Sequence, residues 1–292
     1  MDRRQFLSGL AVFIAGCRIR HSGATIGSKN FTEQLVLGEL LAQYLEHVAQ
    51  IQVDRRFYLA GSYICHQALL SGRIDMYPEY TGTALAAILK EKPSSDHASV
   101  FNQVRQKYAE RFGLEVMPPL GFDNSFAMVM RGPDARSMGI TTLSQLAQFA
   151  PRLRLGVGYE FLERPDGFPG LASTYGLKFA EQPRVMDLGL LYRALENHQV
   201  DVVAGSNTDG LIAALGLVVL ADDRRYFPPY DAVPIVRRDL LQRYPQIRTA
   251  LEQLGGRISV EEMRRMNYAV DGEKKDPADV VRDFLKQKNF LA

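Results

Sequence analysis

The chain has 292 residues, of which 46% are hydrophobic and 23% are charged, and both values are close to those of ordinary globular domains. Its 35 Lys and Arg residues nearly balance its 33 Asp and Glu residues, so no basic surplus favours a nucleic-acid partner. Two cysteines cannot form a disulfide framework, and the five histidines show no HxH or HxxxH spacing. We therefore expect one large domain or two lobes of ordinary size, with no metal site, no cofactor and no nucleic-acid partner.

The start of the chain has the order of an export signal. The stretch Arg3-Arg4-x-Phe6-Leu7 carries positive charge and leads into an apolar run over residues 6–15. This run is too short to span a bilayer as a helix, which takes about 20 residues, but it suits a signal peptide. The arginine pair resembles a twin-arginine signal, although such pairs also occur in ordinary signal peptides.

The segment Ile14-Ala15-Gly16-Cys17 resembles the cleavage box of a lipoprotein. Cleavage there would leave a signal peptide over residues 1–16, a lipidated Cys17 and an anchor or linker over 17–23. Because acyl chains hold a protein at a membrane surface, we expect an extracytoplasmic, membrane-anchored lipoprotein. The alternative is a chance basic and apolar start on a cytoplasmic protein. With Cys17 acylated, Cys65 has no partner, and we predict that it is a small buried residue.

The remainder of the chain alternates short apolar segments with helical patterns. Strands are predicted at residues 23–27, 51–57, 74–77, 125–130, 153–157, 200–204 and 215–220. Helices are predicted at 35–48, 62–72, 83–90, 101–112, 141–151 and 188–197, and the last seventy residues alternate helical patterns with turns. Asn30 and Glu33 match a capping box at the start of the first helix. Repeated strand-then-helix order predicts an α/β protein with parallel strands and helices on both faces, in two lobes joined by short crossings.

Motifs of catalysis are absent from the sequence, which has no GxSxG, GxxxxGK[ST] or HExxH pattern. Gly156-Val157-Gly158 follows a predicted strand but lacks the third glycine of a dinucleotide fingerprint. A hydrolytic cleft stays open as an alternative because Glu33, Glu79, Asp123 and Asp209 fall near loops. None of these carboxylates has a spacing that demands general acid–base chemistry, so we predict that the chain is not an enzyme.

Six loops at predicted strand ends carry aromatic, amide and basic side chains. In open α/β sheets, ligands bind beyond the carboxyl ends of the strands, so these loops are candidates for one shared binding site. Each loop alone could be an ordinary capped or solvated turn. The loops span residues 27–34, 78–83, 122–126, 163–167, 205–209 and 228–231.

Motifs in these loops resemble those of the osmoprotectant-type substrate-binding proteins of ABC importers, whose ligands include glycine betaine, proline betaine, carnitine and choline. The motifs are Gly27-Ser28-Lys29-Asn30-Phe31-Thr32-Glu33-Gln34, Tyr77-Pro78-Glu79-Tyr80-Thr81-Gly82-Thr83, Arg164-Pro165-Asp166-Gly167, Pro228-Pro229-Tyr230-Asp231-Ala232 and the tail Asn267-Tyr268-x-Val270-Asp271-x-Glu273-Lys274-Lys275. The resemblance covers residues 25–291.

The resemblance implies a two-lobed, type 2 periplasmic-binding-protein fold, in which each lobe is a central β-sheet flanked by helices. Residues 24–125 and 231–292 would form the first lobe, and residues 126–230 the second. The ligand would lie in the cleft between the lobes, and hinge closure would bury it. A monomer that delivers its ligand to an ABC permease is implied, with ATP hydrolysis on a different subunit.

The resemblance also implies an aromatic wall for a quaternary ammonium group, which aromatic faces hold because it cannot donate a hydrogen bond. Tyr80 and Tyr230 match two wall positions, and Phe126 matches a third, where the family commonly has tyrosine. Ser206 stands where the family often has a fourth tyrosine. Asn124 falls where an acidic residue can help to set the cage.

Three further residues match positions that hold a ligand carboxylate in the family: Lys29, Thr83 and Arg164. Arg164 could instead form an inter-lobe salt bridge with Asp166 or Glu163. Two cations favour a zwitterionic betaine over choline, whose hydroxyl group does not need them. The altered wall leaves three alternatives open: a bulkier ligand such as a histidine betaine, an ordinary amino acid or other small anion held by the same two cations, and a regulatory lipoprotein that has lost import.

Overall fold

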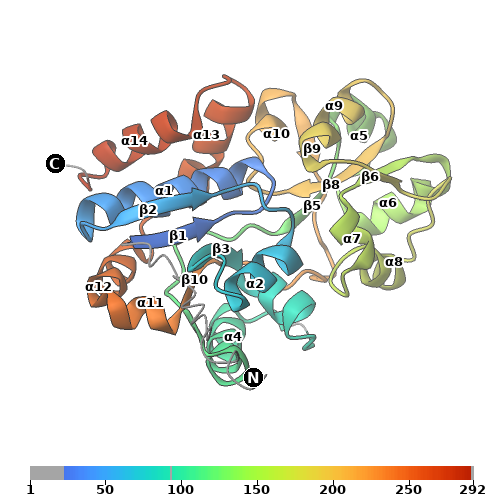
Figure 1. Cartoon of the computed structure of the whole chain (residues 1–292). Coiled ribbons are helices and arrows are strands. Elements are labelled where there is room, and N and C mark those ends of the chain that lie inside the picture. The colour runs from blue at the N-terminus through green and yellow to red at the C-terminus, as the bar shows by residue number, and fades with distance from the viewer. Residues whose placement is uncertain (1–22, 93, 291–292) are drawn as a thin grey trace, which may run out of the picture.

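Two five-stranded sheets organise the chain, each formed by a different part of the sequence (Figure 1). The computed structural model describes residues 23–92 and 94–290. The predicted signal peptide over 1–16, the lipidated Cys17 and all but the last residue of the predicted linker lie outside the described residues. Among those that are described, no helix has the length and apolar character needed to cross a membrane.

The first sheet has the strand order β2-β1-β3-β10-β4. Its strands are β1 (Gly23–Gly27), β2 (Gln52–Arg56), β3 (Met76–Tyr80), β4 (Leu114–Val116) and β10 (Ala232–Arg237). The helical segments that accompany it are α1 (Thr32–Val48), α2 (Ser62–Leu70), α3 (Thr81–Thr83), the π-helical turn Ala84–Ile88, α4 (His97–Phe112), α11 (Arg238–Arg243), α12 (Pro245–Leu254), α13 (Val260–Asp271) and α14 (Pro277–Gln287).

Helices cover both faces of this first sheet. One apolar core joins β1, β3 and β10 to α1, α12, α13 and α14. A second core on the opposite face joins β3, β4 and β10 to α2, the π-helical turn and α4. In Figure 1, α1 and α14 accordingly lie on one side of the strands, and α2 and α4 lie on the other.

The second sheet has the order β7-β6-β8-β5-β9. Its strands are β5 (Phe126–Arg131), β6 (Leu155–Val157), β7 (Arg184–Val185), β8 (Val202–Ser206) and β9 (Leu217–Val219). Its helical segments are α5 (Gly132–Met138), α6 (Leu143–Phe149), the 3-10 turn Ala150–Arg152, α7 (Tyr159–Glu163), α8 (Phe168–Tyr175), the 3-10 turn Leu188–Leu190, α9 (Leu191–Glu196) and α10 (Leu211–Ala214). One core lies against α5 to α8 and another against α9 and α10, so this sheet is also covered on both faces.

The chain crosses between the sheets twice, and the two crossings lie side by side. An isolated antiparallel bridge joins Asp123, before β5, to Asp231, before β10. The backbone N–H of Asn124 donates to the carbonyl oxygen of Tyr230 at 3.0 Å, and the N–H of Tyr230 donates to the Asp123 carboxylate at 2.5 Å.

The α/β class is confirmed, and the predicted parallel pairing is found for β1 with β2 and β3 and for β6 with β7 and β8, but one strand in each sheet runs antiparallel to its neighbours. β10 is antiparallel to both β3 and β4, and β5 is antiparallel to both β8 and β9. These strands are the first that the chain forms after each crossing, so they enter their sheets from the opposite direction. β10 itself was not predicted, because Pro234 interrupts an apolar run that has no alternation. The structure places Pro234 directly opposite Pro78 of β3.

The predicted capping box at the first helix is also wrong. Phe31 is the N-cap of α1, and it makes no side-chain capping bond. The Glu33 carboxylate instead accepts hydrogen bonds from the side chains of Tyr80 and Asn124, because tertiary contacts outweigh the local pattern. Cys65 is free and fully buried, as predicted. Burial raises the pKa of its thiol to about 12.

Candidate functional site

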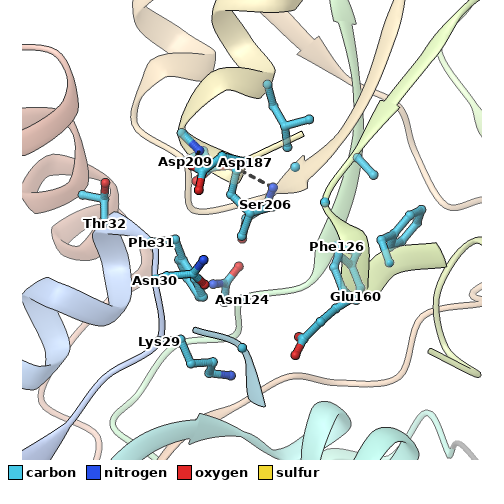
Figure 2. Close-up of a pocket in the computed structure, with 18 of the residues that line it drawn as sticks. Lys29, Asn30, Phe31, Thr32, Asn124, Phe126, Glu160, Asp187, Ser206 and Asp209 are labelled. Atoms are coloured by element: carbon cyan, nitrogen blue, oxygen red, sulfur yellow. Dashed lines mark hydrogen bonds between the residues drawn. The ribbon is translucent and has the colours of Figure 1, made fainter. Parts of the chain in front are cut away.

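A cavity of about 260 Å³ lies between the two sheets (Figure 2). Both sheets and both crossings contribute to its lining. All eight residues that the sequence predicts for ligand binding lie on its wall: Lys29, Tyr80, Thr83, Asn124, Phe126, Arg164, Ser206 and Tyr230. The structure therefore brings together groups that are spread over some 200 positions of the sequence.

Strand ends place most of these residues at the cavity. Lys29 follows β1, Tyr80 ends β3, Phe126 begins β5 and Ser206 ends β8. The others stand nearby: Thr83 ends α3, Asn124 and Tyr230 lie in the two crossings, and Arg164 follows α7. Residues at the edges of two facing sheets can thus meet without any long loop.

Three aromatic residues form a continuous part of the wall. The Phe126 ring lies edge-to-face with Tyr230, with ring centroids 5.5 Å apart, and edge-to-face with Phe161 at 4.9 Å. Tyr80 stacks on Phe31, with centroids 6.5 Å apart. Tyr80 and Tyr230 are buried, so their rings are already fixed by packing.

Three of the tyrosines that line the cavity donate their hydroxyl groups to carboxylates. Tyr80 Oη donates to Glu33 Oε1 at 2.6 Å, and Tyr230 Oη donates to Asp166 Oδ2 at 2.6 Å. Tyr192, on α9, donates its hydroxyl to Asp209. These bonds fix the orientation of the rings, and they place negative charge behind the aromatic surface rather than on it.

Lys29 is a buried cation whose charge is already balanced. Its Nζ forms an ion pair with the fully buried Glu79 and donates to Ser62 Oγ at 3.0 Å. The same atom lies 4.6 Å from the centroid of the Tyr80 ring. Two of the three Nζ protons therefore serve the protein itself.

Arg164 forms a buried, bidentate ion pair with Asp166, at 2.9 Å from Nε to Oδ1 and 2.5 Å from Nη2 to Oδ2. Burial acts to lower the pKa of Arg164, but Asp166 raises it overall, so the guanidinium stays charged. The salt bridge between Arg164 and Asp166, which the sequence offered as an alternative role for Arg164, is therefore present. It does not join the two lobes, because both residues belong to the same loop. Arg164 also makes a contact between the parts of the chain that form the two sheets, because its Nη2 donates to Thr83 Oγ1 at 3.0 Å.

Asn124 and Ser206 supply neutral polar groups. Asn124 Nδ2 donates to Glu33 Oε1 at 2.6 Å, while its buried Oδ1 has no hydrogen-bond partner among the described residues. Ser206 points into the cavity in Figure 2, and its backbone N–H donates to Asp209 Oδ2 at 2.8 Å. Ser206, which stands where the family often has a fourth tyrosine, thus presents a small polar side chain to the cavity.

The cavity wall has more carboxyl groups than cations, and none of these carboxyl groups belongs to the eight residues predicted for ligand binding. Among the described residues, the wall carries Glu160, Asp187, Asp209 and Asp271 against Lys29, Arg164 and Lys274. Burial raises the pKa of Asp209 to about 7 and raises that of Glu160. Asp271 and Lys274 belong to the tail motif, so the sequence did contain a signal that could have placed them at the site. No sequence motif marked Glu160 or Asp187.

Glu160 also marks where the two halves of the wall meet. It lies on α7, and its Oε1 stands so close to Gly61, before α2, that a Cβ atom there would be 1.9 Å away. Figure 2 shows its carboxylate and the end of Lys29 pointing toward one another. A side chain at position 61 would therefore displace the Glu160 carboxylate.

One cluster outside the cavity has the ligand types of a metal centre. His97, Asp123 and Asp231 offer ligand atoms that all lie within 4.8 Å of one another, beside the two crossings. His97 Nδ1 is 2.9 Å and 3.0 Å from the Asp231 carboxylate oxygens, so these two residues already form a hydrogen-bonded pair. Sequence spacing could not reveal a cluster whose members are 26 and 108 positions apart.

Comparison with known proteins identifies the family. A family model matches residues 24–287, and it describes the substrate-binding domain of an ABC-type glycine betaine transport system. The chain is 32% identical over 289 residues to the carnitine transport binding protein OpuCC of Listeria monocytogenes, covering 96% of this chain and 94% of that protein. It is 34% identical over 298 residues to the ergothioneine transport permease/ergothioneine binding protein EgtU of Helicobacter pylori, covering 98% of this chain and 53% of that protein.

Solved structures agree with this assignment. A crystal structure of a glycine betaine/carnitine/choline ABC transporter matches with a TM-score of 0.76 and 34% identity, covering 92% of this chain and all of that one. The two-lobed, type 2 periplasmic-binding-protein fold predicted from the sequence is confirmed, with the cavity between the lobes. The chain belongs to the family of substrate-binding domains of ABC-type glycine betaine transport systems.

Proposed function

We propose that this protein captures a quaternary-ammonium zwitterion of the glycine betaine type and presents it to an ABC permease. The observation that carries the proposal is the meeting, in one buried cavity, of aromatic rings from both lobes with the Arg164 guanidinium. In this account residues 24–125 and 231–292 form one lobe and residues 126–230 the other. The paired crossings would act as the hinge.

The aromatic wall would hold the methylated ammonium group. Tyr80, Phe126 and Tyr230 present ring faces or edges to the cavity, and each cation–π contact contributes about 0.5–2 kcal/mol depending on its desolvation. The unpartnered Oδ1 of Asn124 would add a partial negative charge.

Thr83 and Arg164 would hold the ligand carboxylate. No hydrogen bond joins Arg164 Nη1 to any described residue, so this charged donor stays available. The Thr83 hydroxyl accepts from Arg164, which leaves its own proton free to donate. A carboxylate placed between them would receive one charge-assisted and one neutral hydrogen bond.

A histidine betaine is the second candidate ligand, and Ser206 is the observation that favours it. Serine at this position leaves space where a fourth ring would stand, and Asp187 and Asp209 line the same part of the wall. A ligand with a polar ring could fill that space. The similarity to an ergothioneine-binding relative supports this candidate.

We infer that the chain is a monomeric binding component that acts outside the cytoplasmic membrane, with lipidated Cys17 as its anchor, and that it is not an enzyme. The carboxylates of Glu33 and Glu79, which a hydrolytic mechanism would need, are engaged by Tyr80 and Lys29. Replacing Cys17 by alanine is expected to move the protein from the membrane fraction to the soluble fraction of cells. Unchanged membrane association would contradict the anchor.

Isothermal titration with glycine betaine, carnitine, choline and ergothioneine tests the ligand class. We expect at least one zwitterion to bind with a Kd well below about 1 mM, and choline to bind more weakly. Glycine, which lacks the methyl groups, serves as the control, because an ordinary amino-acid receptor would prefer it. The proposal fails if none of the four quaternary ligands binds below the millimolar range.

A further inference from the structure

Glu33 is a buried carboxylate behind the aromatic wall, and its side chain is only 2% exposed. Its Oε1 accepts from Tyr80 Oη and from Asn124 Nδ2, each at 2.6 Å. Its Oε2 accepts from Asn267 Nδ2 at 3.0 Å. Glu33 therefore contacts one cage ring directly and is held by groups from α13 and from the first crossing.

The partners of Glu33 distinguish it from the other buried carboxylates near the cavity. Glu79 pairs with Lys29, and Asp166 pairs with Arg164. The groups that bind Glu33 are all neutral, and none of the ion pairs formed by the described residues includes it. Its charge is thus not cancelled at close range.

Hydrogen-bond chemistry favours the ionised form of this carboxylate. The amide nitrogens of Asn124 and Asn267 can only donate, so each carboxylate oxygen must accept at least one bond. Burial raises the pKa of Glu33 above its ordinary value overall, and the hydrogen bonds to the carboxylate oppose that rise. A cation bound against the face of the Tyr80 ring would favour the ionised form of Glu33 further.

We propose that Glu33 determines the preference of the site for a cation, by polarising the Tyr80 ring through the tyrosine hydroxyl. A phenol that donates its proton to a carboxylate gains electron density, and this strengthens the attraction of its ring face for a cation. The buried charge itself also attracts the cation with little screening by salt. Glu33 is thus a positioning residue that acts through Tyr80. This inference rests on the proposed function.

Two ligands of the same shape separate this role from a purely structural one. Glycine betaine carries a trimethylammonium group, while 3,3-dimethylbutanoate has the same outline and carboxylate but a carbon in place of the charged nitrogen. The ratio of their affinities measures preference for charge alone. Loss of packing or of the carboxylate contact would weaken both ligands and leave the ratio unchanged.

Isothermal titration of the wild type and of Glu33→Gln with both ligands is the experiment. Glutamine keeps the shape and removes the charge, so we expect the ratio to fall about tenfold, with the loss confined to glycine betaine. Glu39→Gln is the matched control, because Glu39 lies on the same helix, is 7% exposed and pairs with Arg55 outside the cavity wall. The control should retain the wild-type ratio.

The possible results separate the role of Glu33 from the proposed function. If the wild type binds no quaternary ligand, the proposed function fails. If it binds glycine betaine in preference and Glu33→Gln keeps the ratio, the role of Glu33 fails while the proposed function stands. Should Glu33→Gln not fold, Tyr80→Phe gives the answer, because it keeps the ring and removes the link to Glu33. The ratio must then fall, and an unchanged ratio would overturn the inference.

Discussion

The surroundings of Lys29 and of Arg164 look equivalent in the sequence and differ in the structure. Each is a buried cation on the cavity wall, paired with a buried carboxylate and in contact with a hydroxyl side chain. Lys29 gives two of its three protons to Glu79 and Ser62. Arg164 makes three hydrogen bonds but keeps Nη1 free of any described partner.

The difference teaches that charge on a cavity wall does not by itself make a binding group. A cation that gives most of its protons to neighbouring protein groups stabilises the fold around the site, whereas a planar guanidinium can satisfy its own carboxylate with one edge and still offer a donor on another. We therefore propose that Lys29 mainly stabilises the structure of the site and that Arg164 binds the ligand carboxylate.

The largest expected effect is on stability, from Lys29→Met. The substitution keeps an unbranched side chain but leaves the fully buried Glu79 carboxylate without its partner. We expect the free energy of unfolding to fall by about 3–5 kcal/mol in urea denaturation. A loss no larger than that of an exposed pair, about 1 kcal/mol or less, would contradict the structural role.

The double variant Lys29→Met with Glu79→Gln is the control for this prediction. It removes both charges together, so most of the lost stability should return. Its preference for glycine betaine over choline should match that of the wild type. A preference that disappears would mean that Lys29 does hold the ligand carboxylate.

Arg164→Lys is expected to have the next largest effect, and it acts on binding. Lysine keeps the charge, but its single ammonium group cannot pair with Asp166 through one edge and bind a ligand through another, as the planar guanidinium can. We expect the affinity for glycine betaine to fall about 100-fold in isothermal titration, and that for choline less than about fivefold. Equal losses for both ligands would remove Arg164 from carboxylate recognition.

A smaller, pH-dependent effect is expected from Asp209, which lies on the cavity wall in no ion pair among the described residues. Burial raises the pKa of Asp209 to about 7, compared with about 3.9 for an unperturbed aspartate. Between these values the folded chain binds the proton and the unfolded chain releases it. The contribution of Asp209 to stability is therefore present at low pH and is lost as the pH rises toward about 7, by up to about 1.4 kcal/mol per pH unit.

The difference in unfolding free energy between the wild type and Asp209→Asn measures this contribution. From about pH 5 to about pH 8 the wild type should lose stability relative to the variant, because only the wild type must ionise a buried carboxyl group. Parallel pH profiles for the two proteins would show that Asp209 has an ordinary pKa.

Local motifs predicted the cavity wall well, because the residues that line it lie in short segments at or near strand ends, and each segment can be recognised on its own. All eight predicted residues line the cavity, and β1 begins and ends where the apolar pattern indicated. What the motifs could not supply was the pairing of distant groups. Lys29 meets Glu79 only because β1 and β3 are neighbours in the sheet, 50 positions apart in the chain.

Other features escaped prediction because tertiary structure overrode a local signal. Glu33 has the spacing of a capping-box residue, yet its carboxylate lies on Tyr80 and Asn124. The strand β10 contains a proline and no alternation, since it is buried on both faces between β3 and β4. Neither outcome follows from sequence spacing alone.

A crystal structure of this protein with glycine betaine bound tests the central claim most directly. The account predicts the trimethylammonium group against Tyr80 and Tyr230, and the carboxylate within hydrogen-bond distance of Arg164 Nη1 and Thr83 Oγ1. A ligand carboxylate bound to Lys29 Nζ, or methyl groups turned away from both rings, would contradict it.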